Sequence, residues 1–133
     1  MTREDAETFA TRWADAWNAR AIERVLGHFH QDVVFTSPTA LAVVGSPTVR
    51  GQEALRSYWT AALGRIGSLR FTVDRVLWDP VRRELGIIYT SEIDGNSKRV
   101  SENLTFDESG QVVAAEVFHG VGGPAASGQP SAS

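Results

Sequence analysis

Residues 98–106 alternate between apolar and polar side chains, which predicts a strand with one buried face. Val100, Leu104 and Phe106 share the apolar face. Glu102 falls on that same face, although its side chain is acidic. This strand therefore places a carboxyl group on the side that is expected to meet the core.

Two neighbouring strands show a similar mixture. The strand predicted at residues 85–93 places Tyr89 and Ser91 on the same face as its leucine and isoleucines. The strand predicted at residues 113–119 ends with His119 on its apolar face. Either these polar groups satisfy one another in a packed interior, or the interior is hollow and holds a ligand.

Apolar residues at helical spacing predict three helices. The first covers residues 4–19, the second runs from residue 22 to about residue 31, and the third covers residues 51–63. Thr2 is the expected N-cap of the first helix, with Asp5 completing a capping box.

The rest of the chain predicts strands and turns. The expected strands cover residues 33–36, 69–78, 85–93, 98–106 and 111–119. Residues 39–50 are expected to form a loop, whose apolar residues 41–44 either cover the mouth of a cavity or pack on the surface.

This order of elements predicts an α+β fold. We expect a cone-shaped α+β barrel, with three N-terminal helices packed on a strongly curved, mostly antiparallel sheet. Residues 1–122 are expected to form a single domain. Residues 123–133 are rich in Gly, Pro, Ala and Ser and carry no charge, so we expect a disordered tail.

Composition and charge narrow the class of partner. The chain has 133 residues, a net charge of −3 and no cysteine. No basic stripe is available to neutralise phosphates, which argues against nucleic acid. The missing cysteines exclude disulfides and thiolate chemistry. The N-terminus lacks the pattern of a signal peptide, and no apolar run approaches the ~18 residues of a membrane span. We therefore expect a cytoplasmic protein without a membrane partner.

Three segments resemble the nuclear transport factor two-like superfamily: WADAWNAR at 13–20, VLGHFHQDVVFTSP at 25–38 and VRGQEALRSYW at 49–59. Within it, the chain is similar to SnoaL-like and ketosteroid-isomerase-like bacterial proteins over residues 4–120. The resemblance implies the cone-shaped fold. It does not imply one reaction, because the superfamily contains isomerases, cyclases, hydrolases, dehydratases and binding proteins.

The ketosteroid isomerases of this superfamily use a carboxylate base after the first strand and an oxyanion hole. The hole is formed by a first-helix tyrosine and a protonated aspartate on a late strand. The resemblance places Ser37 at the base, Trp13 at the tyrosine and Glu102 at the aspartate. It thus implies that the base is missing and that His119, in the cavity lining, is its substitute.

The expected strand pairing sets the distances between these groups. A tight turn between the two strands brings Tyr89 opposite Val100 or Glu102, within reach of the Glu102 carboxyl. The next turn pairs His119 near Lys98, roughly 13 Å from the level of Glu102, so we expect no direct bond between His119 and Glu102.

We predict that Glu102, Tyr89 and His119 are the catalytic residues. Burial in an apolar cavity raises the pKa of a carboxyl, so Glu102 is expected to donate a proton near neutrality. Assisted by Tyr89, it would polarise a carbonyl or epoxide oxygen while His119 moves a proton.

Each residue also has a structural interpretation. Glu102 bonded to Tyr89 or Arg75 would be a structural acid, and His119 a satisfied histidine at a strand end. His28 and His30 are expected at the end of a helix, pointing to different sides and without a third zinc ligand. We therefore expect neither a metal nor a cofactor.

Other residues are expected to bind the ligand. These are mostly aromatic or apolar: Trp13, Trp17, Ser37, Trp59, Ile87, Val100 and Val117. The predicted function is a cofactor-free acid–base enzyme for a small hydrophobic molecule, of the isomerase, cyclase, dehydratase or epoxide hydrolase type. The alternatives are a non-catalytic binding protein and a dimeric interaction module. Outward apolar residues on the strands (Ile88, Val112 and Phe118) predict a homodimer through the sheet.

The structure can separate these alternatives. An enzyme requires Glu102 and either Tyr89 or His119 at the surface of a cavity. A binding protein would hold Glu102 in an ion pair. An interaction module would have its cavity filled by Trp13, Trp59 and Phe71.

Overall fold

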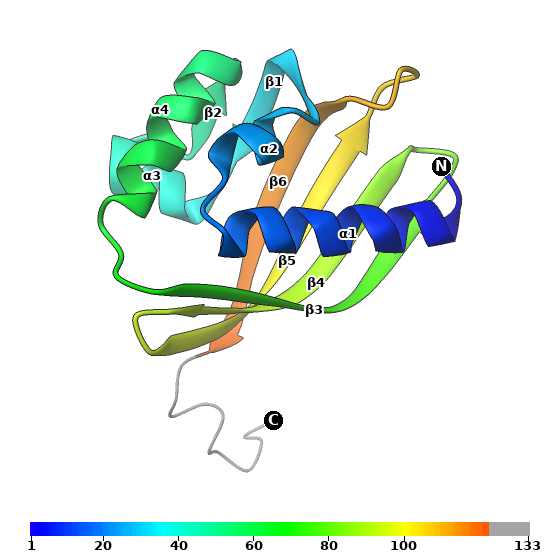
Figure 1. The fold of residues 1–133 in the computed structure, drawn as a ribbon. Coiled ribbons are helices and arrows are strands. Elements are labelled where there is room, and N and C mark those ends of the chain that lie inside the picture. Colours follow the sequence, from blue (N-terminus) through cyan, green and yellow to red (C-terminus); the bar gives the residue numbers. More distant parts are fainter. Residues whose placement is uncertain (123–133) are drawn as a thin grey trace.

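Four helices and six strands make up the described part of the chain, residues 1–122 of a computed structural model (Figure 1). In chain order the elements are α1 (Arg3–Asn18), α2 (Ile22–Leu26), β1 (Phe29–Thr36), α3 (Pro38–Val44), β2 (Thr48–Arg50), α4 (Gln52–Leu63), β3 (Leu69–Asp79), β4 (Glu84–Ile93), β5 (Asn96–Phe106) and β6 (Val112–Gly122). The tail for which disorder is predicted, residues 123–133, lies outside the described residues.

The six strands form one curved sheet in the order β2-β1-β6-β5-β4-β3. Every neighbouring pair is antiparallel except β1 and β6, which run parallel. Figure 1 shows α1 lying across the sheet over β3, β4 and β5. The predicted α+β class and the curved, mostly antiparallel sheet are confirmed, but the sheet does not close into a barrel.

The first helix is held at both ends by side chains. The predicted capping box is confirmed, because the Thr2 amide donates to Asp5 Oδ2 over 2.8 Å and the Asp5 amide donates to Thr2 Oγ1 over 3.1 Å. At the other end, the Asn18 side chain accepts from the Phe71 amide over 2.7 Å and donates to the Phe71 carbonyl over 3.0 Å. Asn18 thus fastens α1 to β3. The residue with left-handed backbone conformation after the helix is Arg20, at φ 57°.

The expected loop at residues 39–50 is wrong over most of its length, because α3 occupies its first half and β2 occupies its last three residues. Ser37 caps this helix by accepting from the Thr39 amide over 3.2 Å, and Pro38 occupies the first turn. Gly45 ends the helix in the left-handed conformation at φ 79°. Ser-Pro at the end of a strand thus also starts a helix, which makes a fourth helix in place of the expected three.

The second helix is shorter than expected. It ends at Leu26, and β1 begins at Phe29, which pairs with Val112 of β6. The helical spacing of the apolar residues continues to Phe29 by coincidence, because long-range pairing with β6 draws this residue into the sheet. His28 and His30 therefore lie at the start of a strand.

Shifts in strand pairing change which side chains face the core. In β3 the pairing shifts between Val73 and Arg75, so Arg75 is exposed and bonds Asp74 over 2.7 Å. In β6 a shift near the start buries Val112 completely, which contradicts its predicted place on the outer face. Bulges of this kind reverse the alternation that a continuous strand would have.

Candidate functional site

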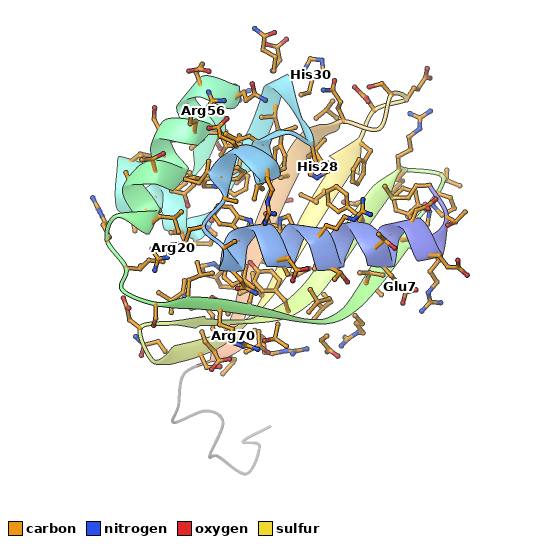
Figure 2. All side chains as sticks on the ribbon, in the orientation of Figure 1. Glu7, Arg20, His28, His30, Arg56 and Arg70 are labelled. Atoms are coloured by element: carbon orange, nitrogen blue, oxygen red, sulfur yellow. The ribbon has the colours of Figure 1, made fainter. Side chains whose placement is uncertain are left out.

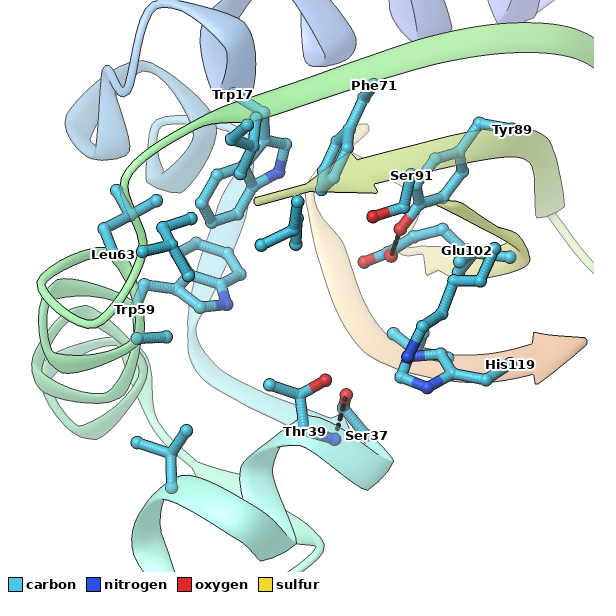
Figure 3. Close-up of a pocket in the computed structure, with 18 of the residues that line it drawn as sticks. Trp17, Ser37, Thr39, Trp59, Leu63, Phe71, Tyr89, Ser91, Glu102 and His119 are labelled. Carbon is cyan, nitrogen blue, oxygen red and sulfur yellow. Dashed lines mark hydrogen bonds between the residues drawn. The ribbon is translucent and has the colours of Figure 1, made fainter. Parts of the chain in front are cut away.

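A cavity of about 270 Å³ lies between the helices and the curved sheet. Figure 3 shows Trp17, Trp59 and Leu63 on one side and Tyr89, Ser91, Glu102 and His119 on the other. Seven aromatic residues contribute to the lining: Trp13, Trp17, Phe35, Tyr58, Trp59, Phe71 and Tyr89. The predicted ligand-binding residues line this cavity with one exception. Ile87 is fully buried but is not part of the lining.

Glu102 reaches this cavity from β5, where it pairs with Ile87 on one side and Val117 on the other. Its side chain is buried, and it forms no ion pair within residues 1–122. Of the two structural interpretations of Glu102, the bond to an arginine such as Arg75 fails, because Arg75 faces outward and pairs with Asp74, whereas the bond to Tyr89 is present. Burial raises the pKa of Glu102 to about 8, so the carboxyl is mostly protonated at neutral pH.

Tyr89 is the hydrogen-bond partner of Glu102. Its hydroxyl lies 3.4 Å from Glu102 Oε1 and donates to it, although Tyr89 itself pairs with Val100 on β5. The Tyr89 ring contacts Phe71 at 4.7 Å and Trp13 at 5.0 Å between centroids, which fixes its direction. Burial raises the pKa of Tyr89 well above its ordinary value, and the Glu102 charge adds to this effect. The Tyr89 hydroxyl therefore keeps its proton near neutral pH and remains a hydrogen-bond donor.

His119 lies closer to Glu102 than expected. The pairing of β5 with β6 shifts between Lys98 and Val100, so His119 is opposite Val100 while Glu102 is opposite Val117. The predicted pairing of His119 near Lys98 is therefore wrong. Glu102 and His119 are diagonal neighbours, about 7–8 Å apart at the backbone. Burial lowers the pKa of His119, and Lys98 lowers it further, which favours the neutral imidazole.

Tyr58 is a further polar group of the cavity, which the sequence placed only on the apolar side of the helix predicted at residues 51–63. It comes from α4, is buried, and lies near Ser37 and Thr39. Burial raises its pKa to about 12, the Glu102 charge contributes, and the hydroxyls of Ser37 and Thr39 oppose the shift. The sequence contained one signal for this role, the position of a tyrosine on the buried face of a helix. A buried tyrosine hydroxyl requires a polar neighbour, so its position indicates other polar groups nearby.

Trp13 has a buried indole N–H. Its side chain is 2% exposed, and within residues 1–122 its Nε1 has no hydrogen-bond partner. Nearly all buried polar groups in proteins are paired, so this exception indicates a place for an acceptor atom. Trp13 also lines the cavity.

The two remaining histidines lie apart from this cavity. Figure 2 shows His28 beside α1 and His30 at the top of the view. The His28 ring packs against Phe9 at 4.9 Å. Within residues 1–122, no group of three metal-ligating side chains is present.

A family model described as SnoaL-like domain matches residues 10–119. The chain belongs to the SnoaL-like domain family. It has the fold of the nuclear transport factor two-like superfamily, as the resemblance predicted.

Solved structures support this assignment. A SnoaL-like protein of unknown function from Burkholderia thailandensis is 27% identical, with a TM-score of 0.80, and the match covers 91% of this chain and 99% of that chain. A putative ketosteroid isomerase from Kribbella flavida is 18% identical, with a TM-score of 0.70 and coverage of 90% and 80%. TerC, co-crystallized with polyporic acid, is 16% identical, with a TM-score of 0.71 and coverage of 86% and 92%.

A comparison with curated proteins found no match. In the described part of the chain, no helix combines the length and apolar character needed to cross a bilayer.

Proposed function

We propose that this SnoaL-like protein is a cofactor-free enzyme that uses acid–base chemistry on a small hydrophobic molecule. One observation carries the proposal: the Glu102 carboxyl is buried, has no cation beside it and lines a cavity with its Tyr89 partner. A neutral carboxyl in such a place donates a hydrogen bond to an oxygen that becomes negative during a reaction. The reaction class is isomerisation, cyclisation, dehydration or epoxide opening.

The cavity favours an enzyme over the two alternatives. Glu102, Tyr89 and His119 all line it, as an enzyme requires. A binding protein with Glu102 in an ion pair is not supported, because the carboxyl is bonded to Tyr89. A filled interior is not supported either, because Trp13, Trp59 and Phe71 form walls around an open volume. TerC, a protein of the same fold, co-crystallizes with polyporic acid, which is consistent with a small-molecule occupant.

In the proposed mechanism the substrate carbonyl accepts a hydrogen bond from the protonated Glu102 carboxyl, while the Tyr89 hydroxyl donates to Glu102 Oε1 and holds the carboxyl in place. His119 removes a proton from the carbon next to the carbonyl, and the resulting enolate oxygen is stabilised by the hydrogen bond from Glu102. Return of the proton to another carbon completes an isomerisation, and attack of the enolate on an electrophilic carbon completes a cyclisation.

The proposal predicts a bell-shaped dependence on pH. His119 acts as a base only when it is neutral, and its pKa is lowered from 6.5. Glu102 donates only when it is protonated, and its pKa is about 8. The rate should therefore be highest between the lowered His119 pKa and about pH 8, and fall on either side.

Deuterium exchange tests this proposal without knowledge of the natural substrate. The probe is 2-tetralone, a compact bicyclic ketone, dissolved in D₂O with the protein and followed by proton NMR. The protein should accelerate exchange next to the carbonyl, and both Glu102→Gln and His119→Gln should reduce this acceleration about a hundredfold. His28→Gln is the matched control, because it changes a histidine outside the cavity.

Exchange that is equally fast in Glu102→Gln contradicts the role of the carboxyl. If 2-tetralone binds but is not exchanged at any pH between 5 and 9, the non-catalytic binding protein is the better interpretation.

The predicted homodimer through the sheet remains a proposal. Phe118 is 54% exposed on β6, and Ile88 on β4 is half-buried. An exposed phenylalanine on an outer sheet face is consistent with a partner there. Analytical ultracentrifugation of the intact chain measures the oligomeric state. The cytoplasmic location also remains a prediction.

A further inference from the structure

The cavity lining contains two cations, Arg65 and Lys98. Lys98 is the only lysine in a chain that has twelve arginines. It is half-buried on β5, opposite Ser91, whereas Arg65 is exposed just after α4. Neither forms an ion pair within residues 1–122, although acidic residues outnumber basic ones in the sequence.

Hydrogen bonds join the chain segments on either side of these two cations. The segment that carries Arg65 is bound to the β4–β5 turn, because the amides of Gly67 and Ser68 donate to Asp94 Oδ1 over 2.8 and 2.9 Å. Arg20 adds a bond of 2.8 Å to the Gly67 carbonyl. Lys98 lies four residues after Asp94 on β5. The two cations therefore lie on segments that are fastened to each other.

The acid of the cavity does not neutralise them. Glu102 is the only acidic residue in the lining, and it lies four residues from Lys98 along β5, roughly 13 Å along the strand. The cavity therefore has a neutral acid at its buried end and unpaired positive charge at its edge.

We propose that the ligand of this cavity is a hydrophobic carboxylic acid. Its apolar body packs on the tryptophan wall, its carboxylate binds Lys98 with support from Arg65, and its reacting part extends toward Glu102. Lys98 and Arg65 thereby select the substrate class and set its direction. The inference rests on the proposed function, because it concerns the same cavity.

The size of the cavity and the number of cations favour a single carboxylate. About 270 Å³ lies just below the usual range of about 300–1,000 Å³ for drug-sized ligands, so the body is limited to a compact ring system. One half-buried ammonium and one exposed guanidinium match a single negative charge. Lys98, being less exposed to solvent, should contribute more than Arg65.

A pair of probes that differ in charge but hardly in shape tests the inference. The probes are 2-naphthoate and 2-naphthamide, and isothermal titration calorimetry measures their affinities for the intact chain. The native protein should prefer 2-naphthoate about tenfold, the effect of one charge-assisted hydrogen bond at a partly exposed site. Lys98→Gln should bring the affinity ratio close to one, and Arg65→Gln should reduce it less.

Two variants serve as controls. Arg70→Gln removes a positive charge from β3 outside the cavity, where Arg70 points away from α1 (Figure 2), and should keep the preference. Lys98→Arg retains the charge and should keep most of it. A preference that falls equally in Arg70→Gln would show a long-range effect of net charge and would overturn the assignment.

The single lysine offers a second measurement on the folded protein. Reductive methylation with ¹³C-formaldehyde labels only Lys98 and the N-terminal amine. Because the chain has one lysine, the dimethyl-lysine NMR signal is assigned to Lys98 directly. Addition of 2-naphthoate should shift this signal, whereas addition of 2-naphthamide should leave it unchanged.

The remaining outcomes distinguish a failure of the carboxylate inference from a failure of the proposed function. Equal affinity for both probes, or a preference that survives Lys98→Gln, overturns the carboxylate inference but leaves the pocket function standing. If neither probe binds, the proposed small-molecule function fails together with the inference.

Discussion

Glu102 is a residue whose burial opposes the stability of the fold but supports the proposed chemistry. Its carboxyl is buried among apolar side chains, and within residues 1–122 its hydrogen-bond partner is the Tyr89 hydroxyl. Transfer of a charged carboxylate to such a place costs free energy, so the group retains its proton instead. The same proton that lowers the cost of burial allows Glu102 to act as a donor.

We expect this conflict to make stability depend on pH. The folded-state pKa of about 8 lies above the ordinary value of 4.5. Between these values the native chain holds a proton that the unfolded chain has released, so rising pH favours unfolding. Glu102→Gln lacks this group and should gain stability relative to the native sequence, by at most about 1.4 kcal/mol per pH unit between pH 5 and 8.

Urea unfolding at one-unit steps from pH 5 to 9 measures this difference. The two proteins share all other titrating groups, so the contributions of these groups cancel in the difference between the two free energies of unfolding. Glu92→Gln, the same substitution at an exposed position of β4, is the matched control. A difference that stays constant from pH 5 to 8 would show that the Glu102 carboxyl is already ionised there.

At the scale of elements, the position of α1 determines the shape of the site. This helix carries Trp13 and Trp17, and its end is fastened to β3 by the two hydrogen bonds between Asn18 and Phe71. β3 is an edge strand, so the backbone groups of Phe71 on that side have no strand to pair with. The Phe71 ring in turn stacks on Trp13 at 5.6 Å. Asn18 therefore links the end of a helix to a wall of the cavity.

Asn18→Ala should lower the free energy of unfolding by about 1–2 kcal/mol, because two hydrogen bonds to the backbone are lost at a partly exposed site. Chemical denaturation measures the change. Thr8→Ala, at an exposed position of the same helix, is the control for the gain in helix propensity. Equal stability of the two variants would show that the contact of Asn18 with β3 contributes nothing.

For the whole molecule, the important property is an interior that is not completely filled. α1 and α4 place large aromatic side chains along the border of the space, and the curved sheet keeps its centre away from the helices. An ordinary core of this size would be filled to crystalline density. The unfilled volume costs packing energy and provides room for a ligand.

Two substitutions to phenylalanine separate the empty part of the interior from the filled part. Ala62 on α4 is half-buried and lines the cavity, so Ala62→Phe should cost less than about 1 kcal/mol and abolish binding of 2-naphthamide. Ala10 on α1 is fully buried, and Ala10→Phe should cost about 1–3 kcal/mol or more. Thermal unfolding and calorimetry measure the two effects. Equal destabilisation by both would show that no room exists beside Ala62.

Much of the inward-facing surface could be predicted from the sequence. Alternation along β4 and β5 identifies Tyr89, Ser91 and Glu102 as neighbours on one face, because strand geometry forces side chains two residues apart to the same side. The capping box at Thr2 was equally predictable. These features depend on interactions between residues close together in the chain.

Tertiary structure decided the features that depend on long-range pairing. The shift between β5 and β6 brought His119 nearer to Glu102, and the shift in β3 turned Arg75 away from it. A bulge changes the facing of every residue that follows, yet its position depends on which strands pair. The contribution of Tyr58 from α4 likewise required the helix to be placed over the sheet. The residue types and their spacing thus determined that this chain holds an acid on a buried face, while packing of distant segments determined that a cavity lies beside it.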